Sequence, residues 1–169
     1  MSNVLASVLE PGLEEEAGLH GEYLQSLRLI ERLHRLLLDV IKNEFERAGW
    51  SDINSVQALL LYNIGSAELT AGELKSRGYY LGSNVSYNLK KLVDGGYIDH
   101  KRSKTDRRSV RISLTEKGKE ACEVVEGLYQ RQLGSIEAVG ELSEDQFVEL
   151  NRSLSRLERF WSDMIRYQL

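Results

Sequence analysis

The sequence predicts a mainly helical chain with one small β-hairpin, and three observations support this fold class. Apolar residues recur at three- and four-residue steps over most of the 169 residues, as they do in amphipathic helices. The period changes to two only around residues 97–114, where apolar and polar side chains alternate as in half-buried strands. Helix start and stop signals separate the periodic segments. We therefore expect a hairpin that lies between two helical parts.

The first helix is predicted to run from about Ala17 to about Ala48 and to end at Gly49. It follows an acidic segment, residues 1–16, that contains Pro11 and reads as an N-terminal tail. Apolar residues cover more than one side of this long helix, which is typical of a helix that packs against more than one partner.

A second helix is predicted between Asn54 and Gly65. Asn54 stands at the N-cap, and Gln57 stands three residues later, where it completes a capping box. We expect its buried stripe to consist of Val56, Leu59, Leu60 and Ile64.

Two further helices are predicted before the hairpin. Thr70 and Glu73 form a T-x-x-E start signal for a short helix that ends at Gly78. After a tight connection, Ser83 is placed to cap a helix that Gly95 and Gly96 terminate. The apolar side of this helix is formed by Val85, Leu89 and Leu92.

The hairpin comprises strands 97–102 and 110–114, joined by a polar tip that is rich in basic residues. Thr115 and Gly118 then lead into a helix that extends to about Val139, and Ser143 opens the last helix. The last helix has a heptad-like seam of Phe147, Leu150, Leu154, Leu157, Trp161 and Met164.

The seam has two interpretations, an internal core or a dimer interface. A domain of about 65 residues, 51–116, does not need three further long helices to complete one core, so chain length favours an interface between two copies.

Helix, short helix, tight turn, helix, strand, basic hairpin and strand follow each other in the order of a winged helix-turn-helix. In that motif the helix after the turn, here residues 83–94, enters the major groove of DNA. Opposite its apolar side this helix carries hydrogen-bond donors and an aromatic ring, which suit phosphates and base edges. These residues are Ser83, Ser86, Tyr87, Lys90 and Lys91. By itself a half-exposed helical tyrosine such as Tyr87 is usually a packing residue, but its place on the polar side favours DNA contact.

The charge distribution favours the same function. The net charge of the chain is −4, which by itself argues weakly against nucleic acid. Residues 75–111, however, contain ten basic and three acidic residues, so this segment carries +7 and the remainder −11. A basic segment in an acidic chain indicates a surface that contacts phosphates.

Several classes of protein are disfavoured. The single cysteine, Cys122, excludes an internal disulfide and is expected to be a small packing residue. Apolar runs are too short to span a bilayer and the N-terminus lacks a basic signal region, so we expect a cytoplasmic protein. His20, His34 and His100 lack metal-ligand spacing, and no catalytic or nucleotide-binding motif is present. We expect no metal, no cofactor and no enzymatic activity.

Residues 106–118 resemble the wing, strand and helix start of the MarR family of bacterial transcriptional regulators. Asp106 and Arg108 match its D-x-R wing, and Leu114, Thr115 and Gly118 match its L-T-x-x-G helix start. The similarity extends from about Leu24 to the C-terminus. Segments 30–35 and 82–92 are most similar to the LdtR/PetP-type alphaproteobacterial branch.

This resemblance implies an obligate homodimer that binds a pseudo-palindromic operator in double-stranded DNA, with two recognition helices roughly 34 Å apart. Residues 17–48 and 117–169 would form the helical dimerisation region and residues 51–116 the winged domain. The wing, residues 103–109, would insert Arg108 into the minor groove, with Arg107 beside it and Asp106 as its orienting residue. The DNA-binding residues are then expected to be Ser83, Asn84, Ser86, Tyr87, Lys90, Lys91, Arg102, Lys104, Asp106, Arg107 and Arg108.

The resemblance further implies a small-molecule effector that alters DNA affinity from a cleft between the dimer helices and the winged domain. Position and residue type make His34, Leu38, Trp50 and Tyr62 candidates for lining it. The alternative function is a winged-helix module that binds a protein and no DNA.

Overall fold

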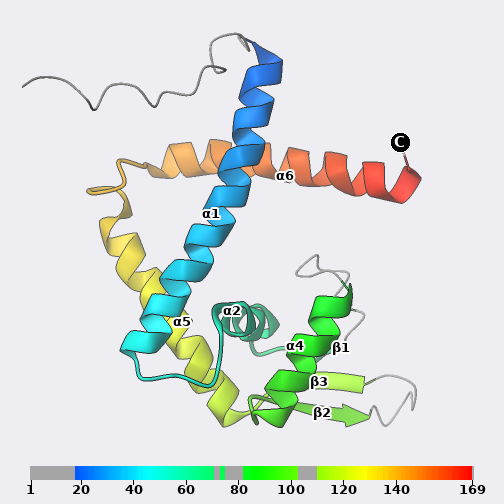
Figure 1. Cartoon of the computed structure of the whole chain (residues 1–169). Coiled ribbons are helices and arrows are strands. Elements are labelled where there is room, and N and C mark those ends of the chain that lie inside the picture. The colour runs from blue at the N-terminus through cyan, green and yellow to red at the C-terminus, as the bar shows by residue number, and fades with distance from the viewer. Residues whose placement is uncertain (1–17, 71–72, 75–81, 103–109, 169) are drawn as a thin grey trace, which may run out of the picture.

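The computed structural model describes residues 18–70, 73–74, 82–102 and 110–168 (Figure 1). The predicted N-terminal tail and the tip of the hairpin therefore lie outside the described residues. So does most of the predicted short helix, although its start signal is seen: Glu73 N–H donates to Thr70 Oγ1 over 3.1 Å, and Thr70 N–H donates to Glu73 Oε2 over 2.6 Å.

The first two helices form as predicted. Helix α1 spans Leu19–Arg47, and the chain leaves it through Gly49, whose φ of 82° favours glycine. Helix α2 spans Ser55–Ile64 and begins with the predicted capping box: Gln57 N–H donates to Asn54 Oδ1, and Asn54 N–H donates to Gln57 Oε1.

The sheet contains one strand that the sequence analysis missed. Strand β1, Leu69–Thr70, pairs antiparallel with β3, Val110–Leu114, which also pairs with β2, Ile98–Arg102, in the order β1-β3-β2. A two-residue strand has no detectable alternation, so only its partner identifies it. Leu69 lies opposite Ile112, and both are buried.

The helix before the hairpin, α4, spans Gly82–Asp94 and therefore begins one residue before the predicted cap Ser83. Its last turn closes through Gly95 and Gly96, whose N–H groups donate to Lys91 O and Val93 O. Tyr97 N–H donates to Leu92 O over 2.9 Å, which brings the chain directly from helix into strand.

The last two helices also begin at the predicted caps. Helix α5 spans Glu116–Ile136 after Thr115, and α6 spans Glu144–Tyr167 after Ser143, which forms a capping box with Gln146. No helix in the described ranges is both long enough and apolar enough to cross a membrane.

The hydrophobic core centres on α2, which packs against α1 on one side and α5 on another. The predicted stripe of α2 is therefore partly wrong: Leu60 and Ile64 are buried, but Val56 and Leu59 are only half-buried. Ala58 and Leu61 are buried instead, because a helix between two partners buries more than one stripe.

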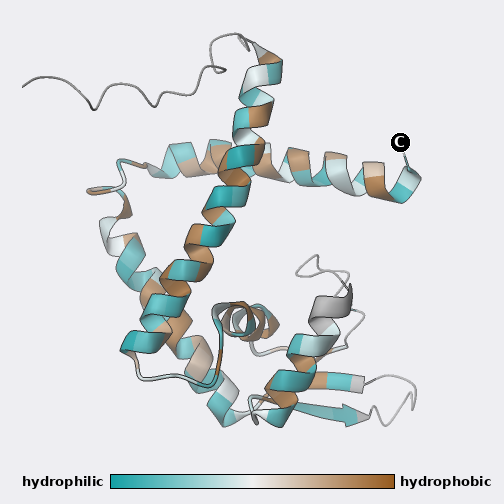
Figure 2. Cartoon of the chain, viewed as in Figure 1, coloured by the Kyte–Doolittle hydropathy of each residue, from teal (hydrophilic) through white to brown (hydrophobic). Residues whose placement is uncertain are grey.

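Helix α6 contributes almost nothing to this core. It crosses α1 far from α2 and the sheet, and its ribbon carries both hydrophobic and hydrophilic residues along its whole length (Figures 1 and 2). None of its residues is fully buried in the described part of the chain, and Trp161 Nε1–H donates to Tyr23 of α1 over 3.4 Å. The interpretation of its seam as an internal core of one chain is therefore wrong.

Candidate nucleic-acid interface

Helix α4 has one buried side and one exposed side, as predicted. Leu89 and Leu92 are buried against the sheet and the core. Tyr87 is 62% exposed, which does not agree with a packing role. The Lys91 ammonium lies 5.7 Å from the centroid of the Tyr87 ring, within the range of a cation–π contact. The exposed side presents Ser86, Tyr87, Lys90 and Lys91 together.

Other predicted contact residues are described only in part. Ser83 and Asn84 lie in the first turn of α4, and Arg102 ends β2, but their side chains lie outside what the structure describes. Lys104, Asp106, Arg107 and Arg108 lie in the undescribed tip of the hairpin. Their contribution to the interface stays a prediction.

The hairpin adds two positive charges that lie side by side. Lys101 of β2 is the register partner of Arg111 of β3, and both are exposed. Side chains directly opposite in an antiparallel pair share one face, where like charges destabilise the sheet. The Glu68 carboxylate lies 3.8 Å from Arg111 and reduces this repulsion only weakly, because both side chains are exposed to water. An anion bound at this face would reduce the repulsion further.

A polar cluster connects the end of α4 to the loop before α2 and to the start of α5. Tyr97 Oη–H donates to Asp52 Oδ1 over 2.7 Å, and the Lys117 ammonium donates to Asp52 Oδ2 over 2.8 Å. Lys117 also donates to Gly95 O over 3.1 Å and lies 4.1 Å from the centroid of the Tyr97 ring. The segment that follows α4 is thus linked directly to the start of α5.

Backbone contacts strengthen this connection. Thr115 N–H donates to Tyr97 O over 3.0 Å, and Thr115 Oγ1 accepts from Gly118 N–H. Helix α5 approaches so closely that a Cβ atom on Gly118 would lie 2.1 Å from Tyr97 O. Sequence reasoning found Thr115 and Gly118 as a helix start but missed Asp52, Tyr97 and Lys117, because nothing along the chain indicates that they meet.

The Asp52 carboxylate makes stability depend on pH. Hydrogen bonds from Lys117 and then from Tyr97 lower the pKa of Asp52 from its ordinary value of 3.8. A lowered pKa contributes stability that is present above the unfolded value and is lost as pH falls through the folded value. We expect protonation of Asp52 below about pH 4 to lower the free energy of unfolding by less than about 1 kcal/mol. The effect is small because the side chains of Lys117 and Asp52 are 41% and 55% exposed, so that water screens the pair.

Urea unfolding between neutral and acidic pH measures this contribution. Asp52→Asn is expected to remove it, so that the variant and the wild type converge in stability at low pH. Asp39→Asn, an exposed carboxylate on α1, is the matched control and is expected to keep the wild-type difference between the two pH values. An equal acid dependence in Asp52→Asn and the wild type would contradict the assignment.

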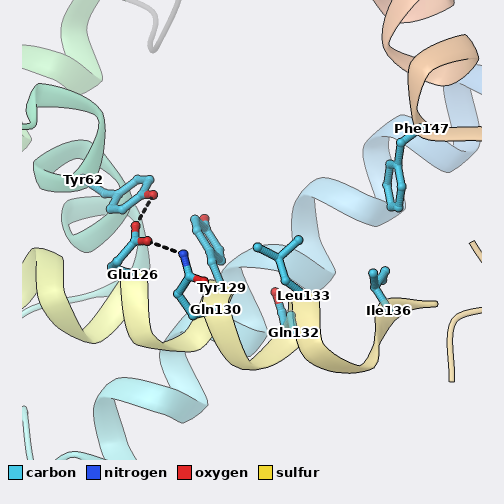
Figure 3. Close-up of a pocket in the computed structure, with 8 residues that line it drawn as sticks. All are labelled: Tyr62, Glu126, Tyr129, Gln130, Gln132, Leu133, Ile136 and Phe147. Carbon is cyan, nitrogen blue, oxygen red and sulfur yellow. Dashed lines mark hydrogen bonds between the residues drawn. The ribbon is translucent and has the colours of Figure 1, made fainter. Parts of the chain in front are cut away.

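The four candidate effector residues do not meet in one place. Tyr62 lines a cavity between α2, α5 and the start of α6 (Figure 3). Trp50 lines a different hollow at the end of α1, where its ring packs 6.1 Å from Phe45 and 6.0 Å from Tyr97. His34 is exposed and Leu38 half-buried on α1, and neither lines these two cavities.

Cys122 lies half-buried against the core. Burial raises the pKa of its thiol to about 11, so the reactive thiolate is scarce at neutral pH. This environment agrees with the predicted packing role.

The chain is similar to known proteins in sequence and in fold. A model of the MarR family matches residues 51–109. The exopolysaccharide II synthesis transcriptional activator ExpG of Rhizobium meliloti (strain 1021) is 41% identical over 147 residues, which are 86% of this chain and 74% of that protein.

Two solved structures are similar in fold. FabT of Streptococcus pneumoniae in complex with DNA has a TM-score of 0.66 and 22% identity, over 84% of this chain and 99% of that chain. A mutant of MarR from E. coli complexed with operator DNA has a TM-score of 0.66 and 24% identity, over 83% of this chain and 99% of that chain.

Proposed function

Because this chain belongs to the MarR family and is a transcription regulator of that family, we propose that it binds operator DNA as a homodimer through α4 and the hairpin. The single observation that carries the proposal is the exposed side of α4, where Ser86, Tyr87, Lys90 and Lys91 lie together opposite the buried Leu89 and Leu92. Hydrogen-bond donors and cations on one side of a helix suit the acceptor-rich major groove and the phosphates beside it.

The homodimer is supported by apolar surface that one chain leaves uncovered. Along α6, Leu150, Leu154, Phe160 and Ile165 are exposed, and a groove of about 570 Å³ runs between Ile30 of α1 and this helix. Exposed apolar surface that forms one continuous face is typical of a protein interface. We assign it to a second copy, because a heptad-like seam pairs with an identical seam in a two-fold dimer.

The two parts of the chain are proposed to have different roles. Residues 51–116 would read DNA from a reducing cytoplasm, where operators lie, and residues 17–48 and 117–169 would hold two readers about one helical turn of DNA apart. The hairpin tip, 103–109, is proposed to reach the minor groove through Arg108. The finer assignment to the LdtR/PetP-type branch stays a prediction.

Lys90→Ala tests the DNA interface. We expect binding to sheared bacterial genomic DNA that weakens with salt, and a log–log slope that is smaller by about 1 in the variant if Lys90 contacts a phosphate. If Lys90 contacts a base edge, operator specificity relaxes at one position by about 1–3 kcal/mol. In fluorescence anisotropy over a salt series, a smaller slope indicates the phosphate contact. An unchanged slope together with relaxed specificity indicates the base contact.

Lys42→Ala is the matched control, since Lys42 is an exposed lysine on α1 that pairs with Glu46 away from α4. It is expected to bind DNA like the wild type. Wild-type binding that does not depend on salt would favour the protein-interaction module instead, and an unchanged Lys90→Ala variant would mean that α4 is not the reading helix.

A further inference from the structure

We propose that the cavity between α2, α5 and α6 binds an organic cation with an apolar body, and that Glu126 is its counter-ion. The cavity has a volume of about 430 Å³ and carries one polar and one apolar end (Figure 3). This inference rests on the small-molecule effector that the resemblance to the MarR family implies, and it names the chemical class of that effector.

The polar end is built around the Glu126 carboxylate. Tyr62 Oη–H donates to Glu126 Oε2 over 2.7 Å, and the Gln130 side-chain amide donates to Glu126 Oε1 over 2.7 Å. These two donors come from different helices and hold the carboxylate in one orientation. Each carboxylate oxygen accepts about two hydrogen bonds, so both oxygens keep capacity for a donor from a ligand.

The same contacts determine the charge of this end. Hydrogen bonds from Gln130 and then from Tyr62 lower the pKa of Glu126, which is therefore ionised at neutral pH. The hydrogen bond to Glu126 raises the pKa of Tyr62 to about 12, so its hydroxyl stays a neutral donor. The polar end therefore carries a negative charge that does not change near neutral pH.

Aromatic rings stand beside this charge. The Tyr62 and Tyr129 rings meet edge to face, with centroids 5.2 Å apart and planes at 88°. A cation near a carboxylate and an aromatic face gains from both, because the ring quadrupole attracts positive charge. None of the eight residues that line the cavity is basic, so an anionic ligand would face Glu126 without a compensating cation.

The opposite end accepts an apolar body. Leu133 and Ile136 of α5 and Phe147 of α6 line it, and Leu133 is 65% exposed in the single chain. A ligand that spans both ends therefore needs a donor-bearing cationic head and a hydrocarbon or aromatic tail.

The position of the cavity would allow such a ligand to change the affinity of the protein for DNA. Tyr62 belongs to α2 in the proposed DNA-reading part, and Glu126 and Phe147 belong to the proposed dimerisation region. A ligand that contacts both parts favours the arrangement in which its contacts are best made, and it shifts the equilibrium by its differential affinity.

Three probes that share an indole ring test the charge preference on the full-length protein. Tryptamine has a cationic head, tryptophol a neutral head and indolepropionate an anionic head. Titration followed by NMR is expected to give the affinity order tryptamine, tryptophol, indolepropionate. Equal or tighter binding of indolepropionate would overturn the proposal, as would no shift at residues of this cavity with any probe.

Variants separate the charge from the shape of the cavity. Glu126→Gln keeps the side-chain volume and is expected to weaken tryptamine about fivefold while leaving tryptophol within twofold, as expected for an exposed charge pair. Tyr62→Phe removes the donor that orients Glu126 and is expected to weaken tryptamine to a smaller extent. Glu120→Gln, an exposed carboxylate on α5 outside the cavity, is the matched control and is expected to bind like the wild type.

The outcome is independent of DNA binding, because the titration contains no DNA. Unchanged tryptamine affinity in Glu126→Gln would overturn the inference while a salt-dependent mobility shift still supports the proposed function. Loss of DNA binding with an intact tryptamine preference would contradict the proposed function alone.

Discussion

Gly118→Ala is expected to destabilise the folded protein by about 3 kcal/mol. The added Cβ would lie 2.1 Å from Tyr97 O, a distance that no Cβ contact tolerates. Tyr97 O cannot retreat easily, because it accepts hydrogen bonds from Thr115 N–H and Thr115 Oγ1. Helix α5 must therefore separate from Tyr97, which connects α4 to β2, and the polar cluster around Asp52 separates with it.

Thermal unfolding measures this effect, and a decrease in Tm of about 10 °C is expected for a chain of this size. Gly134→Ala is the control within the same helix, because its Cβ would have nothing within 4 Å. That substitution is expected to stabilise the protein by about 0.5–1 kcal/mol, as alanine does in a helix interior. An unchanged Tm in Gly118→Ala would mean that α5 does not pack on Tyr97.

Leu154→Glu is expected to convert the proposed homodimer into a monomer and to lower operator affinity about a hundredfold or more. Leu154 lies at the middle of the α6 seam, 41% exposed in the single chain and lining the groove beside α1. A carboxylate there would be buried without a partner in the dimer. Because two linked recognition helices bind with an avidity that one helix lacks, loss of the dimer weakens binding even though α4 is unchanged.

Light scattering gives the mass, and anisotropy with operator DNA gives the affinity. Ser153→Glu is the matched control: the neighbouring residue is exposed, lies outside the groove and acquires the same charge. It is expected to remain dimeric, and circular dichroism should find both variants folded. A wild-type protein that is monomeric, or a Leu154→Glu variant that stays dimeric, would contradict the assignment of this face.

The comparison of α2 with α6 illustrates which features a sequence pattern can predict. Capping residues predicted the starts of both helices correctly, since Asn54 and Ser143 act through neighbours three residues away. The pattern did not reveal how many partners each helix has. Helix α2 packs between α1 and α5 and buries residues outside its predicted stripe, whereas the stronger stripe of α6 is only partly covered within one chain.

The exposed side of α4 could be predicted from the sequence, whereas the cavity beside Tyr62 could not. The outward side of α4 follows from helical period and residue type, so Ser86, Tyr87, Lys90 and Lys91 were found from sequence and lie together in the structure. The effector candidates were chosen without a local pattern, and they lie at separate places. Glu126 was not a candidate, because its significance depends on Tyr62, which is 64 residues away along the chain.

By itself the sequence determined the order of the long helices and of the two hairpin strands, the exposed side of α4 and the contrast between a segment of +7 and a remainder of −11. These features depend on residues within a few positions of each other, where backbone period, capping and charge act locally. Only the tertiary structure decided that α1, α2 and α5 share one core, that Asp52, Tyr97 and Lys117 meet, and that Glu126 faces Tyr62. Those contacts join residues that are distant along the chain, and packing of the whole fold brings them together.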